Sequence, residues 1–536
     1  MFTSEKFALR KVVDDNPSLA PSETRSNLIK DHQKPFLSNF ENFGKLYFDF
    51  TSSPGVQNTS KAKDFQLKEN EEGSAFSSLG IVKDYASRSR KMNVDTMNVP
   101  SSNNEDPKTN DQKLSTTARI RMASQQFIDS YSSKDDETSQ RSHPFAVSFS
   151  GLSDDEAKDI QLLLTLLASA EKIGQKQFKC AIKLIQLCSN RSLNEGNPVE
   201  RLVYYFSEAI HMKINREMGR LACNERESMQ IFDLREALMN VDTCISEFHL
   251  KVPLSQVCQF SSIHTIFENL NKATKIHVID LESCRTGIQY IVLMQAIASC
   301  SEWHIDHIKI TAVGTSSESK IKDTCKRLAD FAKSMSIPFS FKIIMIDDVL
   351  DFNVDLIERN EGEKVAVYAP FFLSTLIAKP NSLEYLMRVI RKIKPCVTVI
   401  TEVEANHTSS AFVDRFTEAL FFYGALFDSM SDCLADDDLN RKVMESVCYG
   451  NSIRNIVAAD GDERTIRHIC VDVWRKFFQR FGMLEIELTD ATLNETNLVI
   501  GNFNCGNSCS VLVDGGCFLV EWKGVPIFSV SAWKFI

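Results

Sequence analysis

Two groups of ionisable side chains have the types and spacing that acid–base or metal chemistry requires. His277 and Asp280 stand three positions apart near the end of a short apolar segment, where an imidazole and a carboxyl group could act as general base and general acid. Glu402, Glu404 and His407 follow a second apolar segment, and their oxygen and nitrogen atoms could bind a metal ion. A structural role is the alternative for both groups, and we favour it. Asp280 would accept backbone hydrogen bonds in a turn, and the second group would connect a strand to the following helix.

The residues around His277 and Asp280 predict the first strand and helix of an α/β sheet. Residues 275–298 read KIHVIDLESCRTGIQYIVLMQAIA, which is an apolar strand ending in an acid, a turn with one glycine, and an amphipathic helix. A doubly wound sheet begins in this way, and such sheets bind ligands at the carboxyl ends of their strands.

The pattern then alternates between strands and helices. Strands are expected at 307–313, 339–346, 365–369 and 397–402, and helices at 320–334, 382–392 and 409–427. This alternation predicts a mainly parallel sheet with helices on both faces. After a helix at 465–481, strands at 517–522 and 526–531 flank Lys523-Gly524 and predict an antiparallel hairpin. A Rossmann-like parallel sheet that ends in an antiparallel hairpin resembles the core of class I methyltransferases.

This layout raises the alternative of an enzyme that uses S-adenosylmethionine. Such enzymes place a glycine-rich turn after the first strand, because glycine has no Cβ and lets the backbone approach the cofactor. The turn here is LESCRTG, in which Gly287 is the one glycine, and no acid follows the second strand until Glu318. The sequence therefore predicts the fold without catalysis, with no catalytic residue, cofactor or metal site.

An all-helical segment is predicted before the sheet. Ser153 and the acids after it are typical of a helix start, and apolar residues recur at helical spacing to about residue 271. We expect residues 151–536 to form one domain, with a helical cap at about 152–271 and an α/β core at about 272–536. Leu163, Leu166 and Leu167 form an LxxLL pattern, which helical coregulator ligands insert into grooves. The alternative, which we favour, is the buried face of an amphipathic helix.

Residues 1–150 differ in composition from the rest of the chain. None of the 15 cysteines and none of the 4 tryptophans lies in this segment, which is rich in Ser, Asn, Asp, Lys and Gln. Because it buries too little apolar surface to offset chain entropy, we predict that it is largely disordered. Scattered aromatics at 36–50 could fold on a partner or be unpatterned. Arg88, Arg90 and Lys91 are a candidate nuclear-import signal, with a solvated loop as the alternative.

Cysteine usage and hydropathy bear on the compartment. The number of cysteines is odd, and residues 1–10 lack the apolar core of a secretory signal, so we expect reduced thiols in the nucleus or cytoplasm. Cys505 and Cys509 form a CxxxC pattern without a second ligand pair, which argues against zinc. No apolar run approaches the ~18 residues that a membrane helix needs, so we expect a soluble protein without a membrane partner.

The net charge of −10 argues against a protein that coats nucleic acid through bulk electrostatics. No segment reads as a helix-turn-helix, zinc finger or basic zipper. Direct contact with DNA would need a surface assembled from the folded domain, and tethering through another factor is the alternative that the charge favours.

Several of these residues resemble the motifs of a known family, the GRAS family of plant transcriptional regulators. The segment HVID and the residues after it resemble the VHIID motif, at His277, Val278, Ile279, Asp280, Gly287 and Gln289. Residues 394–430 are similar to the PFYRE region, with Glu402, Glu404 and His407 at its E-x-E-x-x-H positions. The C-terminal SAW region is matched at Trp474, Arg475, Trp522, Ser531, Ala532 and Trp533. The departures are Tyr290 for the usual Trp, Glu521 for a Gly, Ile469 for an acid and Cys325 for a Gly.

The resemblance implies a methyltransferase-like fold without the activity, in a nuclear regulator that acts through protein contacts. The implied partners are other GRAS proteins, as homodimer or heterodimer, and zinc-finger transcription factors of the INDETERMINATE-domain type. DNA would be bound directly or by tethering. The DELLA class of the family carries N-terminal DELLA and TVHYNP words, and neither occurs in residues 1–150. The pathway and the sign of regulation are left open.

Overall fold

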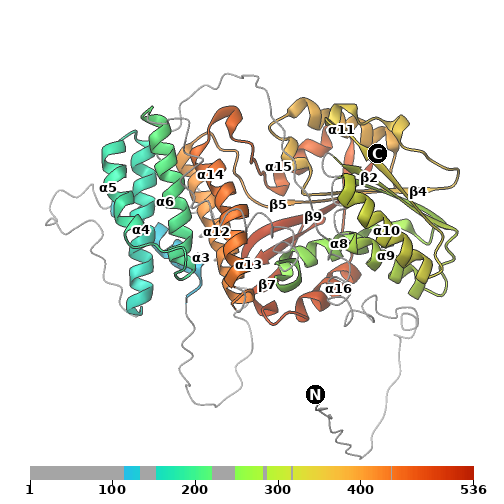
Figure 1. Cartoon of the computed structure of the whole chain (residues 1–536), viewed down its shortest axis with the longest axis horizontal. Helices are drawn as coiled ribbons and strands as arrows, with labels where there is room; N and C mark the ends of the chain where they lie inside the picture. The colour runs from blue at the N-terminus through green and yellow to red at the C-terminus, as the bar shows by residue number, and fades with distance from the viewer. Residues whose placement is uncertain (1–113, 133–151, 220–247, 282–286, 315–317, 436–437) are drawn as a thin grey trace, which may run out of the picture.

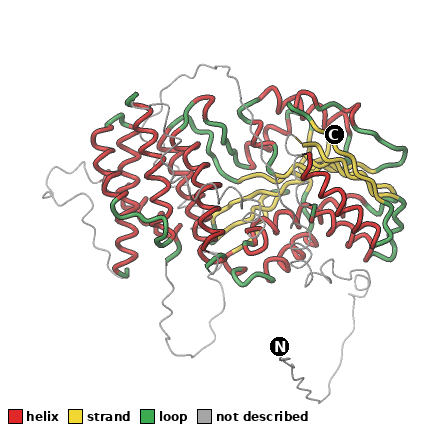
Figure 2. The backbone as a smooth tube through the Cα atoms, in the orientation of Figure 1, coloured by secondary structure: helices red, strands yellow, loops and turns green. Residues whose placement is uncertain are grey.

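The structure is a computed structural model that describes residues 114–132, 152–219, 248–281, 287–314, 318–435 and 438–536. Helices gather at one side of the molecule, and a sheet with helices on both faces forms the other (Figures 1 and 2). Arg88, Arg90, Lys91 and the aromatics at 36–50 lie outside the described residues.

A nine-stranded sheet forms the core of the described chain, with the order β3-β2-β1-β4-β5-β9-β8-β7 and with β6 paired to β9. Its parallel part consists of β1 (Lys275–Leu281), β2 (His307–Gly314), β3 (Phe339–Met345), β4 (Lys364–Pro370) and β5 (Val397–Val403). The antiparallel part consists of β6 (Met483–Ile486), β7 (Cys509–Asp514), β8 (Cys517–Trp522) and β9 (Val525–Phe535). The predicted parallel sheet that ends in an antiparallel hairpin is confirmed.

Two layers of helices cover the two faces of the sheet (Figure 1). One layer contains α8 (Pro253–Leu270), α9 (Ile288–Ser299), α10 (Glu318–Ser334) and α16 (Asp490–Gly501), and it shares a core with alternate residues of β1 such as Ile276 and Val278. The other contains α11 (Pro380–Ile393) and α15 (Val471–Gln479), whose core includes Ile279 and Leu281. Successive residues of a strand therefore enter different cores.

The helical cap is built from two separate parts of the chain. The first part is α4 (Asp154–Gly174), α5 (Phe178–Ser189) and α6 (Pro198–Glu217). The second part is α12 (Phe412–Cys433), α13 (Asp438–Val443), a π-helix (Met444–Gly450) and α14 (Asn451–Ala458). Helix α12 packs against α4 and α6 on one side and against β9 on the other, whereas α8 packs against the sheet. The contacts thus divide the domain differently from the sequence-based boundary near residue 271.

A buried ion pair joins the two parts of the cap. Arg201 on α6 donates to the Glu445 carboxylate in the π-helix, with Nε–O distances of 2.9 and 3.1 Å. Arg441 donates to the same carboxylate at 3.1 Å, and all three side chains are buried. Burial raises the pKa of Glu445 and lowers the pKa of Arg201, although the partner charges oppose both shifts. The charged states of Glu445 and Arg201 are therefore stabilised by their pairing.

Helix α3 (Thr116–Ser132) is an ordered element within residues 1–150, which we predicted to be largely disordered. Ile120 and Ala123 are fully buried against α4 and α12. A Cβ at Gly424 of α12 would collide with Ile120, so glycine permits this close approach. The average composition of residues 1–150 did not reveal this helix, because it lies inside a polar segment.

Two predicted helix boundaries also differ from the structure. The helix expected at 465–481 spans Val471–Gln479. Residues 464–470, which precede it, have no regular structure. The helix expected at 409–427 spans Phe412–Cys433. Strands β6 and β7 were not predicted. Among the described helices, none combines the length and the apolar composition needed to cross a bilayer.

Candidate functional site

Asp280, near the carboxyl end of β1, contacts two side chains of the helix that follows. Asp280 is fully buried, and its Oδ2 accepts a hydrogen bond from the Tyr290 hydroxyl. The Gln289 amide Nε2 lies 3.5 Å from the same oxygen. Tyr290 and Gln289 stand in the first turn of α9, so the described contacts of Asp280 tie β1 to the helix that follows it. The expected backbone bonds of the turn would come from residues outside the described part.

Helix α8, which covers one face of the sheet, completes this cluster. Gln259 donates to Gln289 Oε1 at 2.9 Å, and the Ser262 hydroxyl lies 3.0 Å from the Thr401 hydroxyl of β5. Burial and the nearby Asp280 carboxylate raise the pKa of Tyr368 on β4, whose hydroxyl shares hydrogen bonds with Ser262 and Thr401. Hydroxyl, amide and carboxyl groups are thus satisfied by one another.

The backbone at the start of α9 does not fit a cofactor cradle. Gly287 has φ 72° and stands at the N-terminus of α9, in a conformation that favours glycine. A Cβ there would lie 2.6 Å from Thr324 Cγ2 and 3.2 Å from Leu328 Cδ1, both on α10. The open side of this glycine is therefore filled by a neighbouring helix.

His277 lies on the other face of β1 from Asp280. Side chains alternate along a strand, so residues three positions apart point in opposite directions. His277 Nε2 is 2.8 Å from the Thr311 hydroxyl, and Nδ1 is 3.3 Å from Glu363 Oε2. Burial lowers the pKa of His277 to about 4, with Glu363 opposing the shift and Lys309 reinforcing it. A neutral imidazole on the opposite face cannot form the acid–base pair that the sequence allowed as an alternative.

Glu402, Glu404 and His407 each contact a different element. Glu402 Oε1 accepts a hydrogen bond from the Ser374 backbone at 3.1 Å, in the short helix Leu373–Leu376. Burial raises the pKa of Glu402 to about 7, against the hydrogen bonds from the Ser374 side chain and backbone. Glu404 accepts from the Val471 backbone at 3.0 Å and caps α15, which explains where that helix begins.

His407 is fully buried against α12. Its Nδ1 lies 2.9 Å from Nδ1 of His468, and its ring stacks on Tyr423 at 6.2 Å with an interplanar angle of 8°. Burial lowers the pKa of His407 well below its usual range. Across the described ranges, no three His, Cys, Asp or Glu side chains converge as metal ligands would. The three residues therefore connect β5 to three different elements rather than form one site.

The C-terminal aromatic residues form part of the sheet's second core. Trp533 is 1% exposed, its Nε1 donates to Ser531 Oγ at 2.9 Å, and its ring centroid is 4.8 Å from that of Phe478. The Trp474 ring stacks on the same Phe478 ring, with a centroid distance of 5.3 Å and an interplanar angle of 10°. Ala532 lies fully buried in the first core. Strand β9 is interior, between β5 and β8, and the edge of the sheet on this side is β7.

Arg475 and Trp522 complete the C-terminal region. Arg475 Nε lies 3.1 Å from Glu485 of β6, and its Nη1 lies 3.1 Å from Asp514 at the end of β7. It thereby fastens α15 to two strands. Trp522 is fully buried at the end of β8. The residues that resemble the SAW region thus contact other parts of the fold and stabilise it.

The LxxLL leucines lie inside the cap. Leu163 and Leu166 are fully buried and Leu167 is nearly so, in the core that α4 shares with its neighbours. They could enter a partner's groove only if α4 left the bundle. The alternative interpretation, the buried face of an amphipathic helix, describes them.

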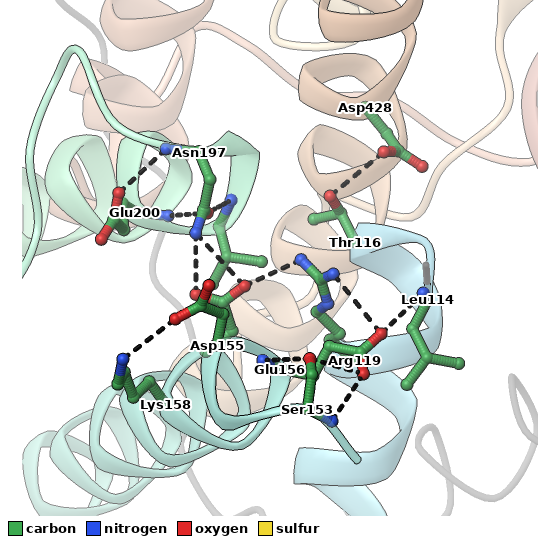
Figure 3. A network of polar contacts seen from close by, with 12 residues as sticks. Leu114, Thr116, Arg119, Ser153, Asp155, Glu156, Lys158, Asn197, Glu200 and Asp428 are labelled. Carbon is green, nitrogen blue, oxygen red and sulfur yellow. Dashed lines mark hydrogen bonds and ion pairs between the residues drawn. The ribbon is translucent and has the colours of Figure 1, made fainter. Parts of the chain in front are cut away.

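A polar network that the sequence did not reveal holds α3 to the cap (Figure 3). Arg119 on α3 forms an ion pair with Asp159 at 2.8 Å, and the Leu114 backbone donates to Glu156 at 2.9 Å. Asn197 at the start of α6 donates to Asp159 at 3.0 Å. The signal for Glu156 was its capping box with Ser153, but nothing in the sequence showed that its carboxylate also accepts from α3.

Comparisons with known proteins identify the family of this chain. A sequence model of the GRAS domain family matches residues 162–534. Among the similar proteins, DELLA protein GAI1 of Vitis vinifera is 27% identical over 387 residues, which are 72% of this chain and 63% of that protein. DELLA protein RGL1 of Arabidopsis thaliana is 28% identical over 382 residues, 71% of each chain. The chain thus spans under two thirds of the grapevine protein's length.

A solved structure has the same fold. The crystal structure of SCL7 in Oryza sativa superposes with a TM-score of 0.61 at 24% identity, over 70% of this chain and 99% of that one. The family match begins inside α4, so α3 and its partners Glu156 and Asp159 lie outside the matched segment, whereas Asn197 lies inside it.

Proposed function

Because the chain belongs to the GRAS domain family, we propose that it is a plant nuclear transcriptional regulator that acts through contacts with other proteins. The observation that supports the proposal is the burial of Asp280 near the carboxyl end of β1. Asp280, which would face a cofactor in an enzyme of this layout, is buried beneath Tyr290 and Gln289. This arrangement uses the methyltransferase-like sheet as a scaffold.

The absence of catalysis is part of the same proposal. Calorimetry with S-adenosylmethionine on the full chain tests it, with Asp280→Asn as the comparison. The expected result is no binding by either protein. Micromolar binding that Asp280→Asn abolishes would contradict the proposal and favour the methyltransferase alternative.

The partners that we propose are a second GRAS protein and a DNA-binding zinc-finger factor. Exposed apolar residues on the cap support association there: Leu193 is 60% exposed and Leu439 is 63% exposed. The Lys442–Glu195 ion pair of 2.9 Å places α13 beside the α5–α6 connection, so both leucines lie at the same end of the cap. Leu193→Asp with Leu439→Asp should weaken association in sedimentation experiments, whereas Leu498→Asp, an exposed leucine on α16, should not.

Tethering to DNA is proposed over direct binding, on account of the acidic net charge. An electrophoretic shift with promoter fragments at physiological salt tests this, with and without the zinc-finger partner. We expect a shift when the partner is present. Tight, sequence-specific binding by the protein alone would contradict tethering. Because the DELLA and TVHYNP words do not occur in residues 1–150, no gibberellin response is proposed.

A further inference from the structure

The outer face of α5 carries a row of exposed cations. Lys179 and Lys183 lie four residues apart on one face of this helix, with Lys176 close before its first turn and Arg191 close after its last. All four side chains are exposed, and we call them the α5 cationic stripe. Helix α5 contains no acidic residue, although the whole chain has a net charge of −10. This part of the cap therefore differs in charge from the molecule as a whole.

The acids closest to the stripe in sequence are Glu171 and Glu195, and both have other partners. The Gln175 amide donates to Glu171 at 2.6 Å, and Lys442 forms an ion pair with Glu195 at 2.9 Å. Within the described ranges, no carboxylate forms an ion pair with a residue of the stripe. Because grouped like charges without counter-charges raise the local electrostatic potential, the α5 cationic stripe attracts a negatively charged partner.

The described part of the domain leaves the stripe uncovered. Helix α5 contacts α4 and α6 through its opposite face, where Ala181, Ile185 and Cys188 are buried. Figure 1 shows α5 at the outer edge of the cap, with α4 and α6 on its inner side. The α5 cationic stripe thus faces away from the rest of the described domain and is open to a partner.

Apolar atoms are exposed on the same face as the cations. The Leu187 side chain, one turn after Lys183, is 52% exposed. The Leu184 side chain is half-buried, and the Cys180 thiol, one turn before it, is exposed. This face therefore offers both positive charge and an apolar contact, which suits an amphipathic partner rather than a purely ionic one.

We propose that the α5 cationic stripe docks an acidic amphipathic helix of another protein. Carboxylates three or four residues apart on the partner pair with Lys179 and Lys183, and an apolar side chain one turn farther along contacts Leu187. Helix α5 has 12 residues and is about 18 Å long at about 1.5 Å per residue, so a partner helix of about three turns covers it.

Duplex DNA and anionic lipid are the other polyanions that a row of cations attracts. The phosphate backbone of DNA offers no apolar group to contact Leu187. A membrane surface takes up the broad apolar face of a helix, whereas the broad apolar face of α5 is buried in the cap. The stripe is also separate from Leu193 and Leu439, which lie after α5 and on α13 and which we propose for association with a second GRAS protein.

Fluorescence anisotropy of the full chain with a labelled synthetic peptide tests the proposal. The peptide is a helix of about three turns, with glutamates three and four residues apart on one face and leucines between them. We expect binding that weakens as the salt concentration rises, because dissolved ions screen the charge pairs. A peptide with lysine in place of each glutamate should not bind.

Substitutions on α5 separate the ionic contribution from the apolar one. Lys179→Glu with Lys183→Glu should weaken peptide binding by about tenfold or more, because two attractions become repulsions. Leu187→Ala should weaken binding less and leave its salt dependence unchanged. Lys326→Glu with Lys333→Glu, at exposed positions of α10, is the control with the same change in net charge and should bind like the wild type. Melting curves show whether each variant folds.

The Cys180 thiol provides a second, local measurement. The peptide should slow alkylation of Cys180 by iodoacetamide and leave alkylation of Cys325 on α10 unchanged. No binding by the wild type, equal loss of binding in the α5 and α10 variants, or an unprotected Cys180 would each overturn the proposal. Stronger binding of a DNA duplex or of phosphatidylserine vesicles at the stripe would also overturn it. So would a loss of self-association by the α5 variant in sedimentation, without any peptide binding by the wild type.

Discussion

Arg201 and Glu445, 244 residues apart in the chain, form a fully enclosed ion pair between α6 and the π-helix. The pair connects the two segments that make up the cap, and Arg441 shares the same carboxylate. A buried charge that loses its partner is costly, whereas a buried pair replaced as a whole is much less so. The Arg201–Glu445 pair therefore couples the stability of one part of the cap to that of the other.

Arg201→Met should lower the free energy of unfolding by about 3 kcal/mol, because Glu445 would keep one cationic partner instead of two. Urea denaturation measures the change. Arg201→Met combined with Glu445→Met should cost less than the sum of the single substitutions. Additivity within about 0.5 kcal/mol would show that the pair is not energetically coupled.

Tyr290→Phe should destabilise the protein by about 1–3 kcal/mol, since it leaves the buried Asp280 carboxylate without its hydroxyl donor. Thermal unfolding measures the loss. In an Asp280→Asn background Tyr290→Phe should reduce stability less, because a buried neutral amide without this hydrogen-bond donor is less unfavourable than a buried carboxylate. Equal costs in the two backgrounds would contradict the role given to this bond.

The stability of the protein should respond to Glu402 as the pH rises. The pKa of Glu402 is raised from its ordinary value of 4.5 to about 7, so the folded state holds a proton that the unfolded state releases. The contribution of protonated Glu402 to the free energy of unfolding is complete below pH 4.5 and is lost as the pH rises through 7. Relative to Glu402→Gln, the wild type should lose about 3 kcal/mol between pH 4.5 and pH 8. Urea titrations at several pH values measure the difference, and parallel curves for the two proteins would refute it.

Trp533→Ala should cost about 3–5 kcal/mol, the usual range for truncation of a buried large aromatic. The ring fills the core beside Phe478, and its loss removes the Ser531 bond as well. Lys534→Ala, at the exposed neighbouring position, is the control and should change little. A folded Trp533→Ala protein with an unchanged melting temperature would show that the region is a surface element.

Helix α3 should be part of the stable domain. Ala123→Asp would place a charge in the contact between α3 and the cap and should lower the melting temperature, whereas Gln125→Ala on the exposed face should not. A chain that begins at residue 114 should likewise be more stable than one that begins at residue 152. Equal stability of these two truncated proteins would mean that α3 contributes no binding energy to the cap.

Periodicity predicted most of the strands because both faces of this sheet are covered. Val278, Val367 and Val399 lie in strands rich in apolar residues, and successive residues of these strands are buried. Strand β7 lacks that signal, since it lies at the edge and leaves Leu512 and Val513 partly exposed. Its residues alternate too weakly to be read from sequence.

Residue types identified the polar positions but not their partners. His277 and Asp280 were read as neighbours because they are close in sequence, yet strand geometry places them on opposite faces. The partners of Asp280 include Tyr290, which differs from the usual family residue, and the partners of Arg201 and Glu404 lie 244 and 67 positions away. Contacts at such separations depend on the tertiary fold and have no local pattern.

The two-part construction of the cap has a consequence for synthesis on the ribosome. Helices α4, α5 and α6 emerge early, but α12, against which α4 and α6 pack, follows only after the five parallel strands. At about 5–20 residues per second, the roughly 200 intervening residues take on the order of 10–40 s to translate. During that interval the α4–α6 helices present uncovered leucines to the cytosol, so the first part of this domain is a natural client for chaperones that bind exposed apolar helices.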